Sequence, residues 1–248
     1  LQEGFNDLQK SLDAIIETLE YFGARVDERA ALPADERPDD LITLLVETEI
    51  DGEPLDRRHL LGTCFLLLLA GIDTTWSAIG SSLWHLATHP EDQARLRAEP
   101  DLIDSAVEEL LRVYSPVTMA REVIADVDVA DNVGARLQTE HIEVAGCPMK
   151  PGDKVLMSFP AANRDPAQFE NPDEFIIDRE RNRHVAFGSG IHRCLGSNLA
   201  RMELRVAIQE WLTRIPTFEL ADPAAVTWTG GQVRGPRTIP VRWSATRP

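Results

Sequence analysis

Cysteine is scarce in this sequence, and the scarcity excludes two classes of protein. Three cysteines occur among 248 residues, at Cys64, Cys147 and Cys194. They are too few and too scattered for a disulfide framework, and they cannot supply the four thiolates that an iron-sulfur cluster needs. We therefore expect reduced thiols and a cytoplasmic location.

The sequence also lacks a long hydrophobic run and an excess of positive charge. Its longest strongly apolar segment, Cys64 to Ile72, is about half of the ~20 residues that a membrane-spanning helix requires, and no basic leader opens the chain. The 25 basic residues are outnumbered by 41 acidic ones, which gives a formal net charge of -16. These absences predict a soluble protein that binds neither nucleic acid nor a membrane.

Hydrophobic periodicity predicts a mainly α fold with small β-sheets, of the α+β class. An amphipathic helix opens the chain and runs to about Val26. A long helix follows over 56–89, with Asp56 as its N-cap. Its first half, Leu60 to Ile72, is apolar on nearly every face, so we expect it to be buried in the core. The other predicted elements are a short helix at 90–96, a helix at 101–114, a small sheet within 117–159 with strands at 127–129, 142–144 and 155–159, a loop at 163–183, and a final helix at about 194–215.

The most informative segment is the loop at 187–196, F-G-S-G-I-H-R-C-L-G. Gly188 and Gly190 permit a backbone bend that turns N–H groups toward the sulfur of Cys194, and the next helix directs its positive dipole end at the same atom. Both effects favour the thiolate, so Cys194 is a candidate metal ligand or nucleophile. The alternative is an inert cysteine, which we expect for Cys64 and Cys147.

Two other segments carry polar residues in unusual places. Asp73 and Thr74 follow Ala70 and Gly71 in the middle of the apolar helix, where polar groups are costly. Either Thr74 bonds back to a carbonyl and bends the helix, or the pair is functional. Glu109 and Arg112 face each other three residues apart, but this spacing alone is weak evidence, because Glu180 and Arg183 repeat it.

In this order, F-x-x-G-x-H-x-C-x-G resembles the haem-binding signature of the cytochrome P450 family. The resemblance covers essentially the whole chain, but only the later part of the family's fold. It implies that Cys194 is the axial ligand of the iron of haem b. It further implies three groups of site residues: haem contacts at His192, Arg121, Phe187, Gly188, Ala70 and Gly71; a structural ion network of Glu109, Arg112 and Arg179; and a substrate side lined by Val117, Thr118 and Met119.

The same resemblance implies a function. Asp73 and Thr74 would relay protons to dioxygen, and the protein would be a monooxygenase, an oxidoreductase acting on paired donors, which oxidises a small hydrophobic organic substrate. Electrons would come from a ferredoxin-type iron-sulfur protein and its NAD(P)H-dependent reductase. This acidic partner would dock on a basic island of six arginines between Arg179 and Arg205. The alternatives are a peroxide-driven peroxygenase and an inactive haem-binding fragment.

The start of the sequence indicates a part of a longer protein. The chain enters directly into a helical pattern at Leu1 without an obvious cap. We expect residues 1–248 to be the C-terminal portion of one cytochrome P450 domain, truncated at the N-terminus and inactive by itself. An apparent insertion at about 130–144 leaves the register of the small sheet open.

Overall fold

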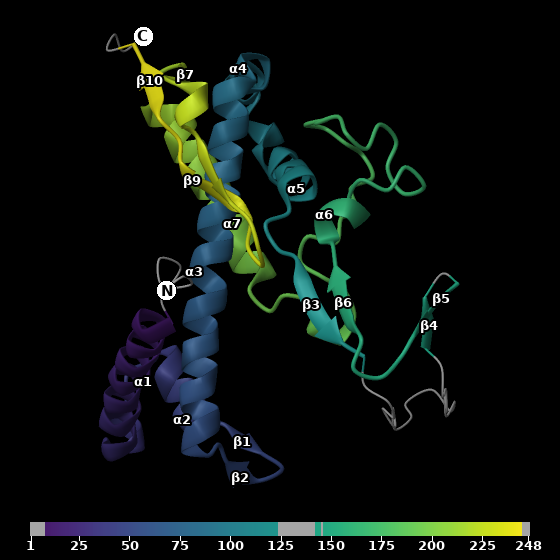
Figure 1. The fold of residues 1–248 in the computed structure, drawn as a ribbon. Helices are drawn as coiled ribbons and strands as arrows, with labels where there is room; N and C mark the ends of the chain where they lie inside the picture. The colour runs from purple at the N-terminus through teal and green to yellow at the C-terminus, as the bar shows by residue number, and fades with distance from the viewer. Residues whose placement is uncertain (1–7, 124–141, 145, 245–248) are drawn as a thin grey trace. The chain divides into compact units, whose positions relative to one another are not determined.

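A computed structural model describes residues 8–123, 142–144 and 146–244 of the chain. In these ranges the chain is mainly helical with small two-stranded antiparallel sheets, as the sequence predicts (Figure 1). It divides into two compact units, Leu1–Ile72 and Asp73–Pro248, and the long helix α3 belongs to both. The predicted strand at 127–129 and most of the apparent insertion lie outside the described residues.

The helices and strands are as follows. The helices are α1 (Leu8–Ala31), η2 (Ala34–Glu36), α2 (Leu41–Glu47), α3 (Arg57–Thr88), α4 (Pro90–Ala98), η3 (Pro100–Leu102), α5 (Ile103–Tyr114), α6 (Phe159–Ala162), η4 (Gly190–His192), α7 (Ser197–Arg214) and η5 (Pro223–Ala225). The strands are β1 (Glu49–Ile50), β2 (Glu53–Pro54), β3 (Met119–Glu122), β4 (Ile142–Val144), β5 (Cys147–Met149), β6 (Lys154–Met157), β7 (Phe218–Leu220), β8 (Thr227–Thr229), β9 (Gly235–Thr238) and β10 (Val241–Trp243).

Side-chain caps start two helices of the N-terminal unit. The carboxylate of Asp40 accepts a hydrogen bond of 2.8 Å from the backbone N–H of Thr43 and so caps α2. The carboxylate of Asp56 accepts one of the same length from the N–H of His59 in the first turn of α3. The predicted N-cap of the long helix is therefore confirmed.

The core of the second unit lies where α5 and α7 pack together with the second half of α3. The helix predicted at 101–114 buries an apolar stripe there, with Leu110 at 2% exposure. Leu204 and Ile208 of α7 and Leu86 of α3 complete the contact. The stripe is formed by residues 3 and 4 apart, which share one face of a helix. This packing holds the elements that carry the candidate site.

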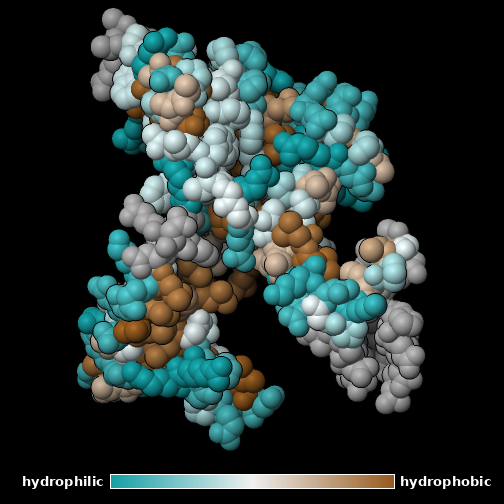
Figure 2. Space-filling model, viewed as in Figure 1, coloured by the Kyte–Doolittle hydropathy of each residue, from teal (hydrophilic) through white to brown (hydrophobic). Residues whose placement is uncertain are grey.

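The expectation that the first half of α3 is buried is wrong for the described residues. Leu60 and Cys64 are buried, but Leu66 is 61% exposed and Ile72 53%. Figure 2 shows hydrophobic surface gathered over this part of the molecule. A helix that is apolar on all faces needs partners on all sides, and the described residues supply them on one side only. In the described ranges, α3 is also the one helix long and apolar enough to cross a membrane, a test that core helices of soluble proteins pass as well.

Two other boundaries differ from prediction. The final helix begins at Ser197 and not near Cys194, because the backbone N–H of Cys194 bonds the carbonyl of Phe187 and closes a loop instead. The predicted strand at 155–159 ends at Met157, and Pro160 then opens the single turn of α6, since proline suits the first turn of a helix. The described strands form separate pairs, β3 with β6 and β4 with β5, and not one sheet.

Candidate functional site

The loop around Cys194 is built on two left-handed glycines. Gly188 and Gly190 have φ values of +70° and +69°, a region that side chains with a Cβ avoid. The Cys194 N–H donates to the Phe187 carbonyl at 2.9 Å, which closes the loop between them. Cys194 is exposed, and the apolar side chains of Ile191 and Leu195 beside it are 97% and 90% exposed. The loop thus presents one thiol on an apolar surface.

A polar brace ties this loop to α5 and α7. The guanidinium of Arg201 on α7 lies 4.6 Å from the ring centre of Phe187 and bonds Glu108 of α5 at 2.6 Å. His184 bonds the same carboxylate at 3.0 Å. Burial would raise the pKa of Glu108, but the hydrogen bonds from His184 and Arg201 outweigh it and lower the pKa to about 2. The sequence carries no local signal for this brace, because Glu108 and Arg201 are 93 residues apart.

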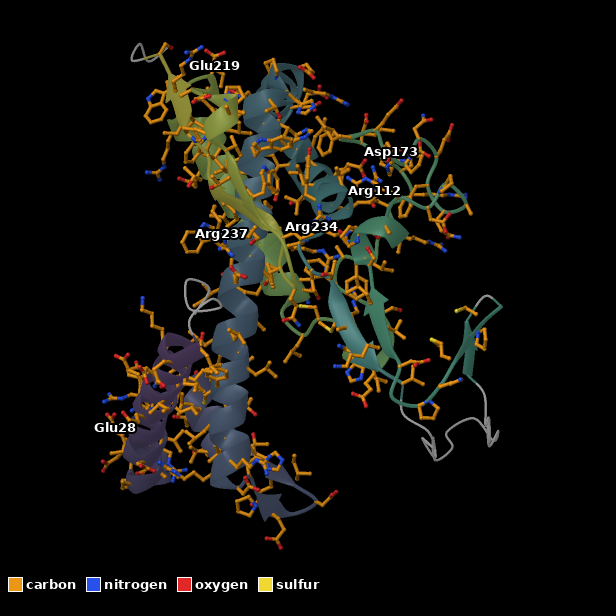
Figure 3. The ribbon with its side chains drawn as sticks, viewed as in Figure 1. Glu28, Arg112, Asp173, Glu219, Arg234 and Arg237 are labelled. Atoms are coloured by element: carbon orange, nitrogen blue, oxygen red, sulfur yellow. The ribbon has the colours of Figure 1, made fainter. Side chains whose placement is uncertain are left out.

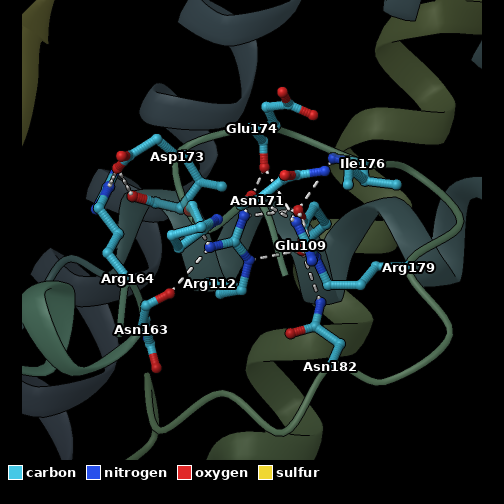
Figure 4. Close-up of polar contacts among 12 residues, drawn as sticks. Glu109, Arg112, Asn163, Arg164, Asn171, Asp173, Glu174, Ile176, Arg179 and Asn182 are labelled. Atoms are coloured by element: carbon cyan, nitrogen blue, oxygen red, sulfur yellow. Dashed lines mark hydrogen bonds and ion pairs between the residues drawn. The ribbon is translucent and has the colours of Figure 1, made fainter. Parts of the chain in front are cut away.

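The structure brings Glu109, Arg112 and Arg179 into one buried cluster (Figure 4). Arg112 forms two parallel hydrogen bonds of 2.8 Å with the Glu109 carboxylate, and both side chains have 0% exposure. Arg179 adds a bond of 3.0 Å to the same carboxylate. Burial alone would raise the pKa of Glu109, but bonds from Arg112 and from the backbone N–H of Ile176 lower it overall.

Asn163 connects this cluster to the cysteine loop, a role that the sequence does not reveal. Its backbone carbonyl accepts from Arg112 at 2.9 Å. Its side-chain oxygen accepts from the N–H of Val185 at 2.7 Å, and the Val185 carbonyl accepts in turn from the N–H of Gly188. Asn163 has 0% exposure, so these bonds are shielded from water. The ion cluster therefore supports the backbone that leads into the loop.

Asp73 and Thr74 lie on α3 and are half-buried. Asp73 forms an ion pair of 3.2 Å with Arg237 of β9, which Figure 3 labels beside α3. Sequence reasoning does not identify Arg237, which follows Asp73 by 164 residues. Ala70 and Gly71 are exposed and belong to the N-terminal unit.

The remaining predicted site residues lie around β3. Arg121 is exposed on β3, and its guanidinium bonds the carbonyl of Ala120 at 2.9 Å. Val117, Thr118 and Met119 are partly buried, and the N–H and hydroxyl of Thr118 donate to the carbonyls of Gln232 and Gly231 between β8 and β9. His192 lies apart from β3, exposed in η4 within the cysteine loop.

The basic island is smaller than the sequence count indicates. The side chain of Arg179 is only 7% exposed and pairs with Glu109, while Arg201 pairs with Glu108. Arg205 lies 3.7 Å from Asp104 in a looser surface pair. Arg181, Arg183 and Arg193 are exposed. Counting charges along the sequence overestimates a basic surface wherever the fold neutralises some of them internally.

The donors of this loop fit a porphyrin-bound iron better than a metal held by side chains alone. Among the described residues, no group of three or more His, Cys, Asp or Glu side chains is arranged to hold a metal ion. A single exposed thiol supplies one ligand, so the remaining ligands must come from the bound group itself. The apolar side chains of Ile191 and Leu195 suit a flat, mostly hydrophobic molecule.

Residues 2–223 match the sequence profile of the family described as cytochrome P450. This chain belongs to the cytochrome P450 family. The resemblance drawn from the cysteine loop is thereby confirmed, as is the expected fold class. Membership implies a haem cofactor.

Bacterial cytochromes P450 are similar in sequence and in structure. The chain is 37% identical over 221 residues to a probable cytochrome P450 127A1 of Sinorhizobium fredii, covering 89% of this chain and 50% of that protein. It is 39% identical to a vitamin D3 dihydroxylase of Streptomyces griseolus, covering 82% and 47%. The solved structure of the cytochrome P450 PksS of the Bacillus subtilis bacillaene polyketide synthase superposes with a TM-score of 0.82 at 35% identity, covering 96% of this chain and 57% of that one. The chain thus spans about half the length of these relatives.

Proposed function

We propose that this chain is the haem-binding part of a monooxygenase that uses dioxygen to oxidise a hydrophobic organic substrate. The observation that carries the proposal is the exposed thiol of Cys194 on a loop that bends at two left-handed glycines, in a chain of the cytochrome P450 family. Haem b, when bound, supplies the iron at which dioxygen is activated.

Each predicted site residue has a proposed task. The thiolate of Cys194 binds the iron, and Phe187 packs beside it, held by Arg201. His192 and Arg121 bind the haem propionates, a task that suits exposed cationic or donor side chains. Gly188 shapes the loop, while Ala70 and Gly71 let the haem approach α3. Glu109, Arg112 and Arg179 hold the fold and retain the haem, and take no part in the chemistry.

Proton delivery falls to α3. Thr74 positions a proton donor near dioxygen, and the carboxylate of Asp73 exchanges protons with solvent, which its 20% exposure permits. Val117, Thr118 and Met119 line the substrate side. The presence of an acid and an alcohol directly after the apolar run of α3 supports the dioxygen route over a peroxide-driven one.

The proposed electron donor is a ferredoxin-type iron-sulfur protein, supplied by an NAD(P)H-dependent reductase. Arg181, Arg183 and Arg193 are exposed, in a protein whose net charge is -16, and offer a local surface for an acidic partner. We also propose that the protein is cytoplasmic. One relative is named a vitamin D3 dihydroxylase, but that name says nothing of this chain, and the substrate here is proposed only as a small hydrophobic compound.

Replacement of Cys194 tests the proposal. In the full-length protein, Cys194→Ala should abolish the carbon monoxide difference spectrum typical of a thiolate ligand and the turnover that depends on dioxygen and a reduced iron-sulfur protein. Cys147→Ala is the matched control, because Cys147 is also exposed but lies outside the loop. An unchanged spectrum in the Cys194 variant would refute the proposed ligand. Turnover with peroxide alone, at the rate seen with the electron donor, would favour a peroxygenase.

A further inference from the structure

Beyond Asp73, one face of α3 carries two small residues, Ser77 and Gly80, and then Trp84. Asp73, Ser77, Gly80 and Trp84 are spaced by four, three and four positions, so they line the same side of the helix. Ser77 is 3% exposed and Gly80 is buried. This face of α3 is therefore covered in the second unit, and the hairpin of β8 and β9 covers it.

The backbone of the hairpin packs directly against α3, with no side chain between them at Gly235. A Cβ added to Gly235 at the start of β9 would lie 2.5 Å from the Cβ of Ser77, so a larger residue does not fit there. A Cβ on Gly80 would lie 3.1 Å from the ring of Pro236. On β8, the ring of Trp228 meets the ring of Trp84 edge to face at 5.3 Å.

This seating determines where Arg237 lies. Gly235 lies against Ser77, and Pro236 lies against Gly80. Arg237 follows directly on β9, and Asp73 precedes Ser77 by about one turn of α3. From this position the long side chain of Arg237 reaches the carboxylate of Asp73, where the atoms are 3.2 Å apart.

The far end of the hairpin is also anchored. The N–H of Thr118 donates to the carbonyl of Gln232 at 3.0 Å, and its hydroxyl donates to the carbonyl of Gly231 at 2.9 Å. The N–H of Arg234 donates to the carbonyl of Pro116 at 2.7 Å. One hairpin thus joins the proposed proton-delivery residue to the segment proposed to line the substrate side.

We infer that Arg237 is a positioning residue for proton delivery: its guanidinium holds the carboxylate of Asp73 in the orientation from which it exchanges protons between solvent and the Thr74 side of α3. The inference rests on the proposed function. The reaction consumes dioxygen, two electrons and two protons, and places one oxygen atom in the product and the other in water. When protons arrive by an unguided route, the same two electrons and two protons reduce dioxygen to hydrogen peroxide. Arg237 therefore governs how completely electrons are used for product.

Two measurements on the full-length, haem-loaded protein test the inference. The first is a double-mutant cycle on urea unfolding with Asp73→Asn and Arg237→Gln. If the side chains interact in solution, the urea midpoint of the double variant should be close to that of either single variant. It should not be lowered by the sum of the two single shifts. Additive shifts would overturn the inference.

The second measurement separates positioning from stability. Arg237→Gln should lower kcat about 10-fold, leave KM for the substrate unchanged, raise the solvent isotope effect on kcat and raise the share of electrons lost as peroxide. Arg237→Lys, which keeps the charge, should show a smaller change in each quantity. If the Gln variant does not fold, the Lys variant replaces it in the same comparison with the wild type. Arg242→Gln is the matched control, an arginine of the next strand that pairs with Glu219 away from α3.

The outcomes for the inference and for the proposed function are distinguishable. A normal thiolate carbon monoxide spectrum in Arg237→Gln, together with a wild-type isotope effect and peroxide share, would overturn the inference alone. Absence of that spectrum in the wild-type protein would overturn the proposed function. The double-mutant cycle on urea unfolding would still measure the interaction between Asp73 and Arg237.

Discussion

Among the described residues with less than 2% exposure, Arg112 has the largest side chain. Because it is charged, its effect on stability depends on the partners that surround it. Beyond Glu109, its guanidinium bonds the carbonyls of Asn163, Pro172 and Glu174 at 2.9, 2.6 and 2.7 Å. We predict that Arg112→Ala lowers the free energy of unfolding by about 3–5 kcal/mol, because it leaves the Glu109 charge and these carbonyls buried without a partner. Urea unfolding of the full-length protein measures it. Arg242→Ala, at an exposed pair, should cost less than about 1 kcal/mol; equal losses in the two variants would contradict the prediction.

His85 gives a pH-dependent prediction at the same scale. It is 1% exposed, bonds Asp92 at 2.9 Å and the Tyr114 hydroxyl at 2.8 Å, and stacks on His89. Burial, aided by the charge of His89, lowers the pKa of His85 to about 3. In the unfolded chain a histidine takes up a proton near pH 6.5, whereas folded His85 does not, so its contribution to stability is present above pH 6.5 and is lost as the pH falls toward 3.

Between pH 7 and pH 5 the wild-type protein should therefore lose about 1–2 kcal/mol more of its unfolding free energy than His85→Gln does. Urea unfolding at both pH values measures the difference. This window avoids the titration of Glu108, whose pKa is about 2. His59→Gln, at an exposed position, is the control. The same pH dependence in wild type and His85→Gln would show that folded His85 takes up a proton.

At the scale of elements, the contact between β9 and α3 depends on the absence of a side chain at Gly235. We predict that Gly235→Ala lowers the free energy of unfolding by about 1–3 kcal/mol, since its Cβ would overlap Ser77, including the backbone of α3. Gly230→Ala is the matched control, because a Cβ at Gly230 in the same hairpin meets nothing within 4 Å. Thermal unfolding of both variants measures the difference. If the Gly235 variant is as stable as the Gly230 variant, the backbone of β9 at Gly235 does not pack against Ser77 of α3.

Elements also differ in how well the sequence predicts them. The helices α4 and α5 are predicted within a few residues, because Pro90 suits the first turn of α4, and Ser115 before Pro116 ends α5. The start of α7 is missed, since hydrogen bonding within the cysteine loop takes up residues that could otherwise extend the helix. Strands β7 to β10 were not predicted; each has only three or four residues, too few for a clear alternation.

At the scale of the whole molecule, the exposed apolar side of α3 is the most unusual surface. Leu66, Leu67, Leu69 and Ile72 are each more than 40% exposed. We propose that the additional half found in the relatives covers this surface in the full-length protein. Residues 1–248 expressed alone should therefore bind a hydrophobic dye strongly and self-associate, whereas the full-length protein should do neither. Fluorescence titration and sedimentation measure this. Variants Leu66→Asp and Leu69→Asp should reduce dye binding by the short chain, and strong dye binding by the full-length protein would contradict the prediction.

The sequence by itself determined the family, the candidate ligand Cys194 and the mainly helical fold, because these depend on local chemistry: glycines before a thiol, a repeating apolar stripe, and proline at helix ends. Tertiary structure alone decided the partners of charged residues. Asp73 with Arg237, Glu108 with Arg201, and Asn163 with the cysteine loop are joined by the path of the chain between them. It also decided which arginines are neutralised and which face of α3 is covered, since a side chain's environment depends on the elements that pack against it and not on its neighbours in sequence.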